Sequence, residues 1–251
     1  MNEAYPSIRL TLVIPCYNES ERVGLLYNGL ESFIKVWPGT LEVIIVNDGS
    51  KDDTAEALKK HPVYQQNSSI ITIISQENTG KGGALRNGVL HATGDYILTI
   101  DADMASPPGE LMGWMKSLDW KLDDHTIYIG SREHKDSVIK KQNDRKVAGS
   151  IFNMVVRTLM PLKVKDTQCG FKLYPAALAK KYFGDLHTYG WAHDVEILYK
   201  AKLDKMQIVE MPLQWEAIEG SKIRLFRDAV NMLLETMQIV FRTKRNFKKG
   251  Q

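Results

Sequence analysis

A pair of carboxylates directly follows a short apolar run of the sequence. The run Tyr96–Ile100 is rich in β-branched and aromatic residues and predicts a buried strand. Asp101 and Asp103 follow at spacing i, i+2, which places both side chains on one side of an extended chain. Mg²⁺ or Mn²⁺ would relieve the repulsion, because such cations bind carboxylates together with a substrate phosphate. An acidic turn is the other interpretation, since Ser106–Gly109 reads Ser-Pro-Pro-Gly, and on these residues alone both stay open.

The elements that would position this pair form a repeating pattern of strand, polar loop and helix. Apolar runs predict strands at Leu10–Pro15, Glu42–Val46, Ile70–Ile74, Tyr96–Ile100 and Thr126–Gly130. The repetition predicts an α/β fold with a mostly parallel, doubly wound (Rossmann-like) central sheet flanked by helices. Polar clusters follow three of the strands, at Tyr17–Glu19, Asn47–Ser50 and Asp101–Asp103. Ligands bind beyond the carboxyl ends of such strands, so we expect the clusters to share one rim, which favours the metal interpretation.

A glycine-rich loop, Gly80–Gly83, precedes one of the predicted helices. It lacks the small residue that a dinucleotide-binding fingerprint needs at Leu85, and it lacks the Lys-Ser/Thr ending of a Walker loop. Its backbone N–H groups and Lys81 could contact an anion at the helix N-terminus. A tight turn built of glycines explains the loop equally well.

The C-terminal half is less regular. Ser131–Arg145 is polar and charged and predicts a long exposed loop, and Val147–Met160 is an apolar helical stretch. A further helix is predicted from Gly190 to Leu203, and Leu225–Arg242 is helical by its period. We expect a catalytic domain over residues 1–220 and a C-terminal amphipathic helix with a basic tail over residues 221–251.

Composition limits the classes of function. The chain has 251 residues, is 43% hydrophobic, and carries a net charge of +3. Residues 221–251 hold eight Lys or Arg against two acidic residues, which suggests an anionic partner such as a phosphate-rich ligand or a membrane surface. We predict no transmembrane helix, because no uncharged apolar run approaches about 18 residues. Nucleic acid is disfavoured, because the basic residues are not interleaved with stacking aromatics.

Several motifs together resemble the inverting family 2 glycosyltransferases of GT-A fold, over roughly residues 8–241. The general motifs are Val13–Glu19, Val46–Ser50 and Asp101–Asp103. Two motifs, Asn78–Ala84 and Gly130–Arg132, resemble those of the dolichyl-phosphate (polyprenyl-phosphate) sugar synthases. Three more resemble those of the dolichyl-phosphate β-glucosyltransferases within that group: Asp166–Leu173, Trp191–Glu196 and Glu219–Lys222. The resemblance implies transfer of a hexose, glucose from UDP-glucose, to dolichyl or undecaprenyl phosphate.

The resemblance also implies roles for single residues around the donor. Asp48 would accept a hydrogen bond from the nucleotide base, with base and ribose between Pro15, Tyr17 and Glu19. The others implied to lie at the donor are Asp101 at the ribose or a metal-bound water, Asp103 on the metal, and Lys222 near the diphosphate. Lys81 is a further nucleotide-binding candidate, through the anion contact expected at its helix N-terminus.

On the acceptor side the resemblance implies cations that dock a lipid phosphate. Arg132 follows Gly-Ser as in the family, and Arg145 matches a second arginine, although Gly149 replaces the expected serine and Ser150 comes one place later. Asp194 and Glu196 match a carboxylate pair that would orient the sugar or act as base. Their i, i+2 spacing on a helix turns them to different sides, so we expect one at most to face the site.

Other readings keep the fold and change the chemistry. GDP-mannose could replace UDP-glucose as the donor, and a non-lipid glycan could replace the lipid acceptor. A binding module without activity is disfavoured, because Asp48, Asp101, Asp103 and Arg132 are all present. We expect a cytoplasmic protein held peripherally on a membrane by its C-terminal helix and basic tail. The sequence leaves the oligomeric state open.

Overall fold

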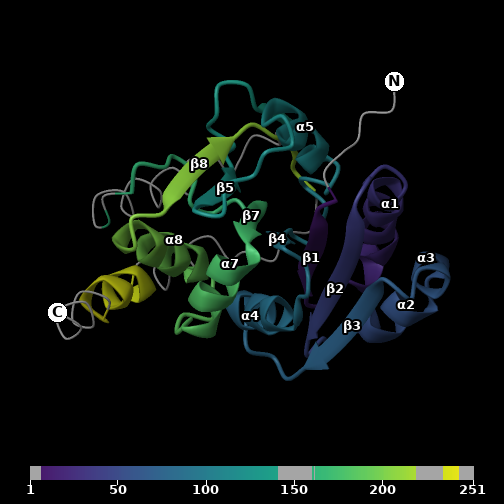
Figure 1. Ribbon diagram of the computed structural model, residues 1–251. Coiled ribbons are helices and arrows are strands. Elements are labelled where there is room, and N and C mark those ends of the chain that lie inside the picture. The colour runs from purple at the N-terminus through teal and green to yellow at the C-terminus, as the bar shows by residue number, and fades with distance from the viewer. Residues whose placement is uncertain (1–6, 141–159, 161, 219–233, 243–251) are drawn as a thin grey trace.

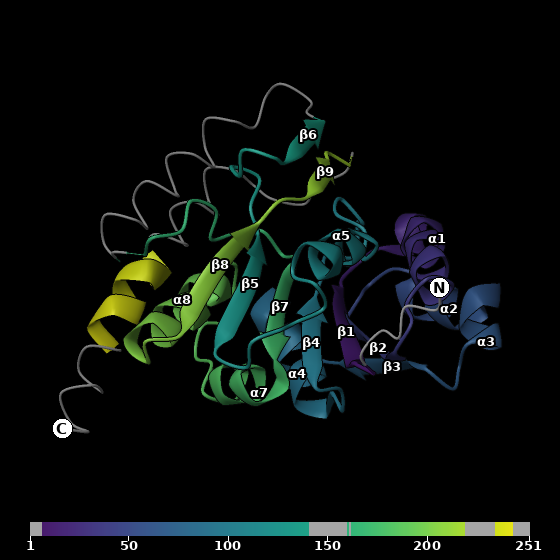
Figure 2. The same ribbon diagram turned by 45° about the horizontal axis from the view of Figure 1, so that its top comes forward.

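The structure is a computed structural model, and it describes residues 7–140, 160, 162–218 and 234–242. A seven-stranded sheet forms its centre (Figures 1 and 2). The strands are β1 (Arg9–Cys16), β2 (Thr40–Asp48), β3 (Ile71–Gln76), β4 (Tyr96–Thr99), β5 (Thr126–Gly130), β7 (Lys172–Pro175) and β8 (Gln207–Met211). Their order is β3-β2-β1-β4-β7-β5-β8, and β7 runs antiparallel to both of its neighbours while the other pairs are parallel.

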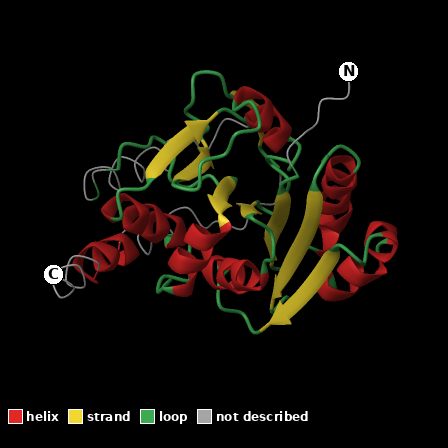
Figure 3. Ribbon diagram, in the orientation of Figure 1, coloured by secondary structure: helices red, strands yellow, loops and turns green. Residues whose placement is uncertain are grey.

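Helices cover both faces of this sheet, as Figure 3 shows in red. They are α1 (Val23–Ile34), α2 (Thr54–Lys60), α3 (Pro62–Gln66), α4 (Lys81–His91), α5 (Glu110–Ser117), α7 (Ala176–Gly184) and α8 (His193–Leu203), with a 3-10 turn η1 (Ser20–Arg22). Successive strand residues point to opposite faces. Leu12 of β1 accordingly packs in one core cluster with Leu30 of α1 and Trp114 of α5, and its neighbour Val13 packs in the other with Val89 of α4. The result is a three-layered α/β/α structure.

A second, two-stranded sheet lies beyond the carboxyl ends of β5 and β8. It pairs β6 (Val138–Lys140) with β9 (Gln214–Glu216) in parallel, and Figure 2 shows it standing apart from the main sheet. Part of the predicted exposed loop Ser131–Arg145 is therefore a strand, and the part after residue 140 lies outside the described residues. The β6–β9 pair extends the rim at which the polar clusters gather.

The predicted fold class is confirmed, including the five strands, which the structure extends or trims at their ends. One boundary matters for the chemistry. Strand β4 ends at Thr99, so Asp101 and Asp103 lie in the following turn, and the strand alternation that predicted their common side does not apply. The sequence did not predict α5 or α7.

The C-terminal prediction is described only in part. Residues 234–242 are helical, in agreement with that part of Leu225–Arg242, whereas the proposed boundary at residue 220 lies outside the described residues. The apolar stretch Val147–Met160 is described only at Met160, which is fully buried. Within the described part of the chain, no helix combines the length and hydropathy needed to span a bilayer.

Candidate active site

The acidic pair lies in the turn after β4. The turn is closed by the Met104 N–H, which donates to the Asp101 carbonyl at 3.3 Å. The Ala105 N–H donates to the Asp103 carboxylate at 3.0 Å. Burial and the nearby negative charge of Asp101 raise the pKa of Asp103. Two carboxylates held close in this way attract a cation.

Lys81, the first residue of α4, supplies one positive charge beside this pair. Its Nζ lies 2.5 Å from Oδ1 of Asp101 and over the ring of Trp191, 5.4 Å from the centroid. Burial opposes the charge of Lys81, but Asp101 and Asp194 outweigh it and raise the pKa of this lysine. The lysine therefore stays charged and leaves part of the pair's negative charge uncompensated.

The glycine-rich loop before α4 packs tightly against other loops. Gly80 has φ +94°, a conformation that L side chains rarely adopt, and its N–H donates to Oδ2 of Asp48. The Gly82 N–H donates to the Tyr189 carbonyl at 2.8 Å, and a Cβ on Gly82 would lie 2.7 Å from Cβ of His193. Two of the N–H groups available for an anion are thus used inside the protein. The geometry favours the tight-turn interpretation of this loop.

Asp48, at the end of β2, holds the loop that carries Lys81. Its carboxylate is buried and accepts hydrogen bonds from the side chain of Gln76 at 2.8 Å and from the backbone N–H groups of Thr79 and Gly80 at 2.9 and 2.8 Å. This network accounts for the burial of the charge. The contact with a nucleotide base stays a prediction.

The residues after β1 line the same rim. Pro15, Tyr17 and Glu19 are all partly buried, and Oε2 of Glu19 accepts a hydrogen bond from Nε of Arg22 at 2.6 Å. Glu19 raises the pKa of Arg22, and the charge of Asp103 adds to this effect. The β1 loop is therefore electrostatically linked to the acidic pair, whereas its contact with a base stays a prediction.

Arg132 lies after β5 and is clamped by Asp166. Nε and Nη2 of the arginine lie 2.7 and 2.8 Å from the two carboxylate oxygens, a bidentate pair. Asp166 is 1% exposed; burial would raise its pKa, but Arg132 lowers it. The guanidinium lies over the ring of Trp215, 5.8 Å from the centroid. The arginine is thus fixed in direction by a carboxylate and an aromatic ring.

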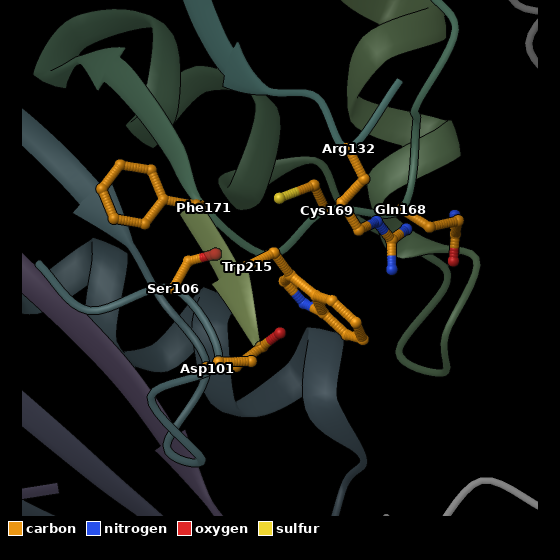
Figure 4. A pocket seen from close by; sticks show the side chains of 9 residues that line it. Asp101, Ser106, Arg132, Gln168, Cys169, Phe171 and Trp215 are labelled. Atoms are coloured by element: carbon orange, nitrogen blue, oxygen red, sulfur yellow. The ribbon is translucent and has the colours of Figure 1, made fainter. Parts of the chain in front are cut away.

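A small cleft separates Arg132 from Asp101 of the acidic pair, and Figure 4 shows the side chains that line it. Its lining residues are Asp101, Ala105, Ser106, Arg132, Gln168, Cys169, Gly170, Phe171 and Trp215. A Cβ at position 170 would lie 2.5 Å from Oδ2 of Asp101, so only glycine lets this loop lie against the carboxylate. Burial raises the pKa of the Cys169 thiol to about 11, which makes it a poor nucleophile.

Asp194 and Glu196 of α8 belong to separate networks, as their spacing predicts. Asp194 lies 2.8 Å from Nζ of Lys172, a fully buried lysine. Burial opposes the charge of Asp194, but His193, Lys172 and Lys81 lower its pKa. Asp194 is thus coupled to the acidic pair through Lys81.

The Glu196 carboxylate is held on another side of α8. It is fully buried and lies 2.8 Å from Nζ of Lys200 and 2.9 Å from Nη2 of Arg242 in the C-terminal helix. The Thr188 N–H donates to it at 2.8 Å. None of these partners lines the cleft, so the carboxylate has a structural use, and the catalytic role that the resemblance implied for Glu196 stays a prediction.

Other predicted site residues lie outside the described residues: Arg145, Ser150 and Lys222. Sequence reasoning missed Gln168 and Trp215 in the cleft wall and the buried Lys172 beneath it. Gln168 and Lys172 belong to the stretch Asp166–Leu173, which carried part of the resemblance. Trp215 is the middle residue of the three-residue strand β9 and gave no signal, because its position is set by pairing with β6.

The acidic pair fits a divalent cation that completes its shell from a ligand. In the described part of the chain, no group of three or more His, Cys, Asp or Glu side chains could hold a metal by itself. Two carboxylates plus phosphate oxygens are, however, a common ligand set for Mg²⁺ and Mn²⁺. Burial, and after it the charge of Asp101, raise the pKa of Asp103, and such a cation would compensate both effects.

Comparison with known families agrees with this geometry. The family model of Glycosyl transferase family 2 matches residues 11–183, which include the acidic pair, Lys81 and Arg132. The chain belongs to this family and is a glycosyltransferase.

Within the family the chain is similar to a particular group of enzymes. It is 35% identical over 246 residues to a dolichyl-phosphate beta-glucosyltransferase of Dictyostelium discoideum, covering 94% of this chain and 75% of the relative. The human dolichyl-phosphate beta-glucosyltransferase is 36% identical over 229 residues, covering 87% of this chain and 70% of the relative. The resemblance to this group is confirmed.

A solved structure shares the fold. The glucosyl-3-phosphoglycerate synthase of Mycobacterium tuberculosis, solved with Mn²⁺, UDP-glucose and phosphoglyceric acid, superposes with a TM-score of 0.69 at 15% identity. The match covers 93% of this chain and 79% of that one. At this identity the likeness shows a common GT-A fold.

Proposed function

We propose that the enzyme transfers glucose from UDP-glucose to a polyprenyl phosphate, with inversion, and that it uses Mg²⁺ or Mn²⁺. The observation that carries the proposal is the cleft between Arg132 and Asp101; Lys81 lies beside Asp101, and Asp103 follows in the same turn. A diphosphate donor suits the acidic pair with its cation, and an anionic acceptor suits Arg132 across the cleft. The names of the relatives support the transfer of glucose and a dolichyl-phosphate acceptor.

The proposed reaction depends mainly on how the protein positions the donor and the acceptor. A bound cation would be held by Asp101 and Asp103 and would stabilise the nucleoside diphosphate as it leaves. A phosphate monoester is already largely ionised at pH 7, so the acceptor needs docking more than deprotonation. Arg132 can dock it without being displaced, because Asp166 fixes the guanidinium through Nε and Nη2. Asp48, Pro15, Tyr17 and Glu19 would line the nucleoside on the neighbouring strands.

The direct experiment measures transfer of labelled sugar from UDP-glucose and, in parallel, from GDP-mannose. The acceptors are undecaprenyl and dolichyl phosphate, with EDTA, Mg²⁺ or Mn²⁺. We expect metal-dependent label in the organic phase from UDP-glucose alone. Label from GDP-mannose alone would refute the donor, and hydrolysis without a lipid product would refute the acceptor.

We also propose that the enzyme binds the cytoplasmic face of a membrane peripherally, through helix 234–242 and the basic residues after it. This helix exposes Leu234, Met237 and Phe241, which are 52%, 40% and 76% exposed and follow one helical face. Ile239, on the other side, is fully buried. Arg242 is paired with Glu196, so the Lys and Arg residues of the sequence that follows would supply the positive charge that an anionic leaflet attracts.

Flotation with anionic liposomes tests this attachment. Phe241→Ser should reduce the bound fraction severalfold, because it removes the most exposed apolar side chain of the face. Leu25→Ser on α1, where Leu25 is 40% exposed, is the matched control and should leave binding unchanged. Equal binding of Phe241→Ser and the parent protein would contradict the proposal.

A further inference from the structure

Gln168 has a buried polar group that the described part of the protein does not use. Its backbone N–H donates to Oδ1 of Asp166 at 3.2 Å, which fixes the residue in the cleft wall. Its side-chain Nε2, in contrast, is buried and has no hydrogen-bond partner among the described residues. An unpaired buried donor is unfavourable, and native structures retain few of them. A ligand in the cleft would explain why this one is retained.

The neighbour of Gln168 in the wall is also a donor. Nε and Nη2 of Arg132 donate hydrogen bonds to Asp166, and no hydrogen bond within the described ranges involves its Nη1. Figure 4 shows the Arg132 and Gln168 side chains together on one side of the cleft and Asp101 on another, with the Trp215 ring between them. This side of the cleft therefore presents two donors, one charged and one neutral.

We infer that Gln168 binds the acceptor phosphate together with Arg132: Nε2 of Gln168 donates to one phosphate oxygen and Nη1 of Arg132 to another. The inference rests on the proposed function and adds a binding residue to it. A charged donor beside a neutral one suits an oxyanion, which accepts hydrogen bonds from both. The donor diphosphate belongs on the far side, because the acidic pair and Lys81 lie there.

A neutral amide suits this place for an electrostatic reason. The acceptor oxygen must keep enough negative charge to attack the sugar, and a second cation would withdraw more of it than an amide does. The wall already contains the bidentate pair of Arg132 and Asp166, whose charges balance. Gln168 would orient the phosphate without adding charge to the cleft.

The test uses binding and turnover in two variants of the full chain. Gln168→Met keeps the length and removes the donor, and Gln168→Glu keeps the shape and adds negative charge. Gln66→Glu, on the exposed end of α3, is the control for charge. Calorimetry with farnesyl phosphate should show a Kd raised about tenfold to a hundredfold in Gln168→Met and more in Gln168→Glu, because a hydrogen bond to a charged group is lost. The Kd for UDP should stay within about twofold.

A pH series adds a readout that mere loss of packing would not change. The monoester gains its second charge with a pKa of about 6, so repulsion by a carboxylate at position 168 grows across that range. The penalty of Gln168→Glu on farnesyl phosphate binding should therefore rise between pH 5.5 and 7.5, while that of Gln168→Met rises less.

The outcomes separate this inference from the proposed function. Unchanged binding of farnesyl phosphate in Gln168→Met, or a loss confined to UDP, would overturn the inference. If the parent protein transfers no glucose to any lipid phosphate and farnesyl phosphate binding still falls in Gln168→Met, the phosphate site stands and the proposed reaction fails. Equal loss of both ligands in both variants, with a lowered melting temperature, would make Gln168 structural and would also refute the inference.

Discussion

Two carboxylate sites flank the end of β1, and they differ in how far the protein itself compensates their negative charge. Asp48, after β2, accepts hydrogen bonds from a side chain and two backbone N–H groups of the next loop. Asp101 and Asp103, after β4, share few such donors, and burial together with mutual repulsion raises the pKa of Asp103. The charge of Asp48 stabilises the fold through these hydrogen bonds, whereas the charge of the acidic pair is available to a cation that the protein does not supply.

The difference gives a physical criterion for assigning roles. A carboxylate whose oxygens are filled by the chain stabilises the fold, and its loss should appear as lower stability. A crowded carboxylate pair destabilises the protein when no cation is bound, and its loss should appear as lower activity. Asp166, Asp194 and Glu196 fall on the satisfied side, because each carboxylate is almost fully buried in an ion pair. Asp101 also pairs with Lys81, but its side chain is 39% exposed and lies beside the charge of Asp103.

The largest effect is expected at the crowded pair. Asp103→Asn should lower kcat/KM for sugar transfer by about a hundredfold to a thousandfold, because charge stabilisation of the leaving group is lost. In EDTA its melting temperature should equal or exceed that of the parent protein, since burial and Asp101 disfavour the charge of Asp103. Transfer assays and thermal melts measure the two quantities. A variant that keeps its activity, or that melts much lower in EDTA, would remove the contrast with Asp48.

The second-largest effect is expected at Glu196, in the stability of the protein and not in its activity. Glu196→Gln should lower the free energy of unfolding by about 3 kcal/mol, because it leaves Arg242 without its carboxylate partner and Lys200 with only the more exposed Asp185. Donor and acceptor KM should stay unchanged. Glu31→Gln on α1 removes an exposed i, i+4 pair with Lys35 and should cost less than about 0.5 kcal/mol. A changed KM in Glu196→Gln would return this residue to the active site.

These contrasts also show what the sequence could predict. The parallel sheet and the common rim follow from apolar runs that each end in polar residues, and this pattern is enough to place Asp48 and Asp101 at one edge. Whether a carboxylate is satisfied depends on long-range contacts, however. The donors to Asp48 come from a loop some 30 residues away, and the loop against Asp101 comes from Gly170, 69 residues away.

The C-terminal half was less predictable for a related reason. Its central strand β7 is antiparallel and short, and it is buried on both sides, so its four residues carry no periodic pattern. Lys172 lies in that strand as a fully buried lysine, which its pairing with Asp194 and its hydrogen bond to the Cys169 carbonyl explain. The cleft wall at Gln168 and Trp215 depends on this strand and on the β6–β9 pair, and both are set by contacts distant in sequence.

A smaller effect is expected at Asp48, the carboxylate whose hydrogen-bond donors the protein itself supplies. Asp48→Asn should lower the free energy of unfolding by about 2 kcal/mol, because an amide nitrogen would face donors that now bond to a carboxylate oxygen. Denaturant titration measures this, and Asp53→Asn on the neighbouring exposed turn is the control, expected within about 0.5 kcal/mol. The variant should also raise the donor KM severalfold, because the loop that it loosens carries Lys81. A loss of activity as large as that of Asp103→Asn, without loss of stability, would place Asp48 with the crowded pair.

The smallest effect tests the criterion at an exposed carboxylate. Asp52 accepts hydrogen bonds from Ser20 and Thr54, which lower its pKa to about 2 although burial works in the other direction. Because the pKa in the folded state lies below the unfolded value of about 3.9, the contribution of Asp52 is present above pH 4 and is lost as the pH falls toward 2.

Asp52 is exposed, so solvent screening reduces this contribution, and Asp52→Ala should cost about 1 kcal/mol at pH 7. The difference between the parent protein and Asp52→Ala should shrink as the pH is lowered from 5 to 2.5, measured by urea unfolding at each pH. A difference that stays constant would mean that the carboxylate acts by shape and not by charge. The criterion of satisfied charge would then hold only for the buried carboxylates, where water cannot replace the missing donors.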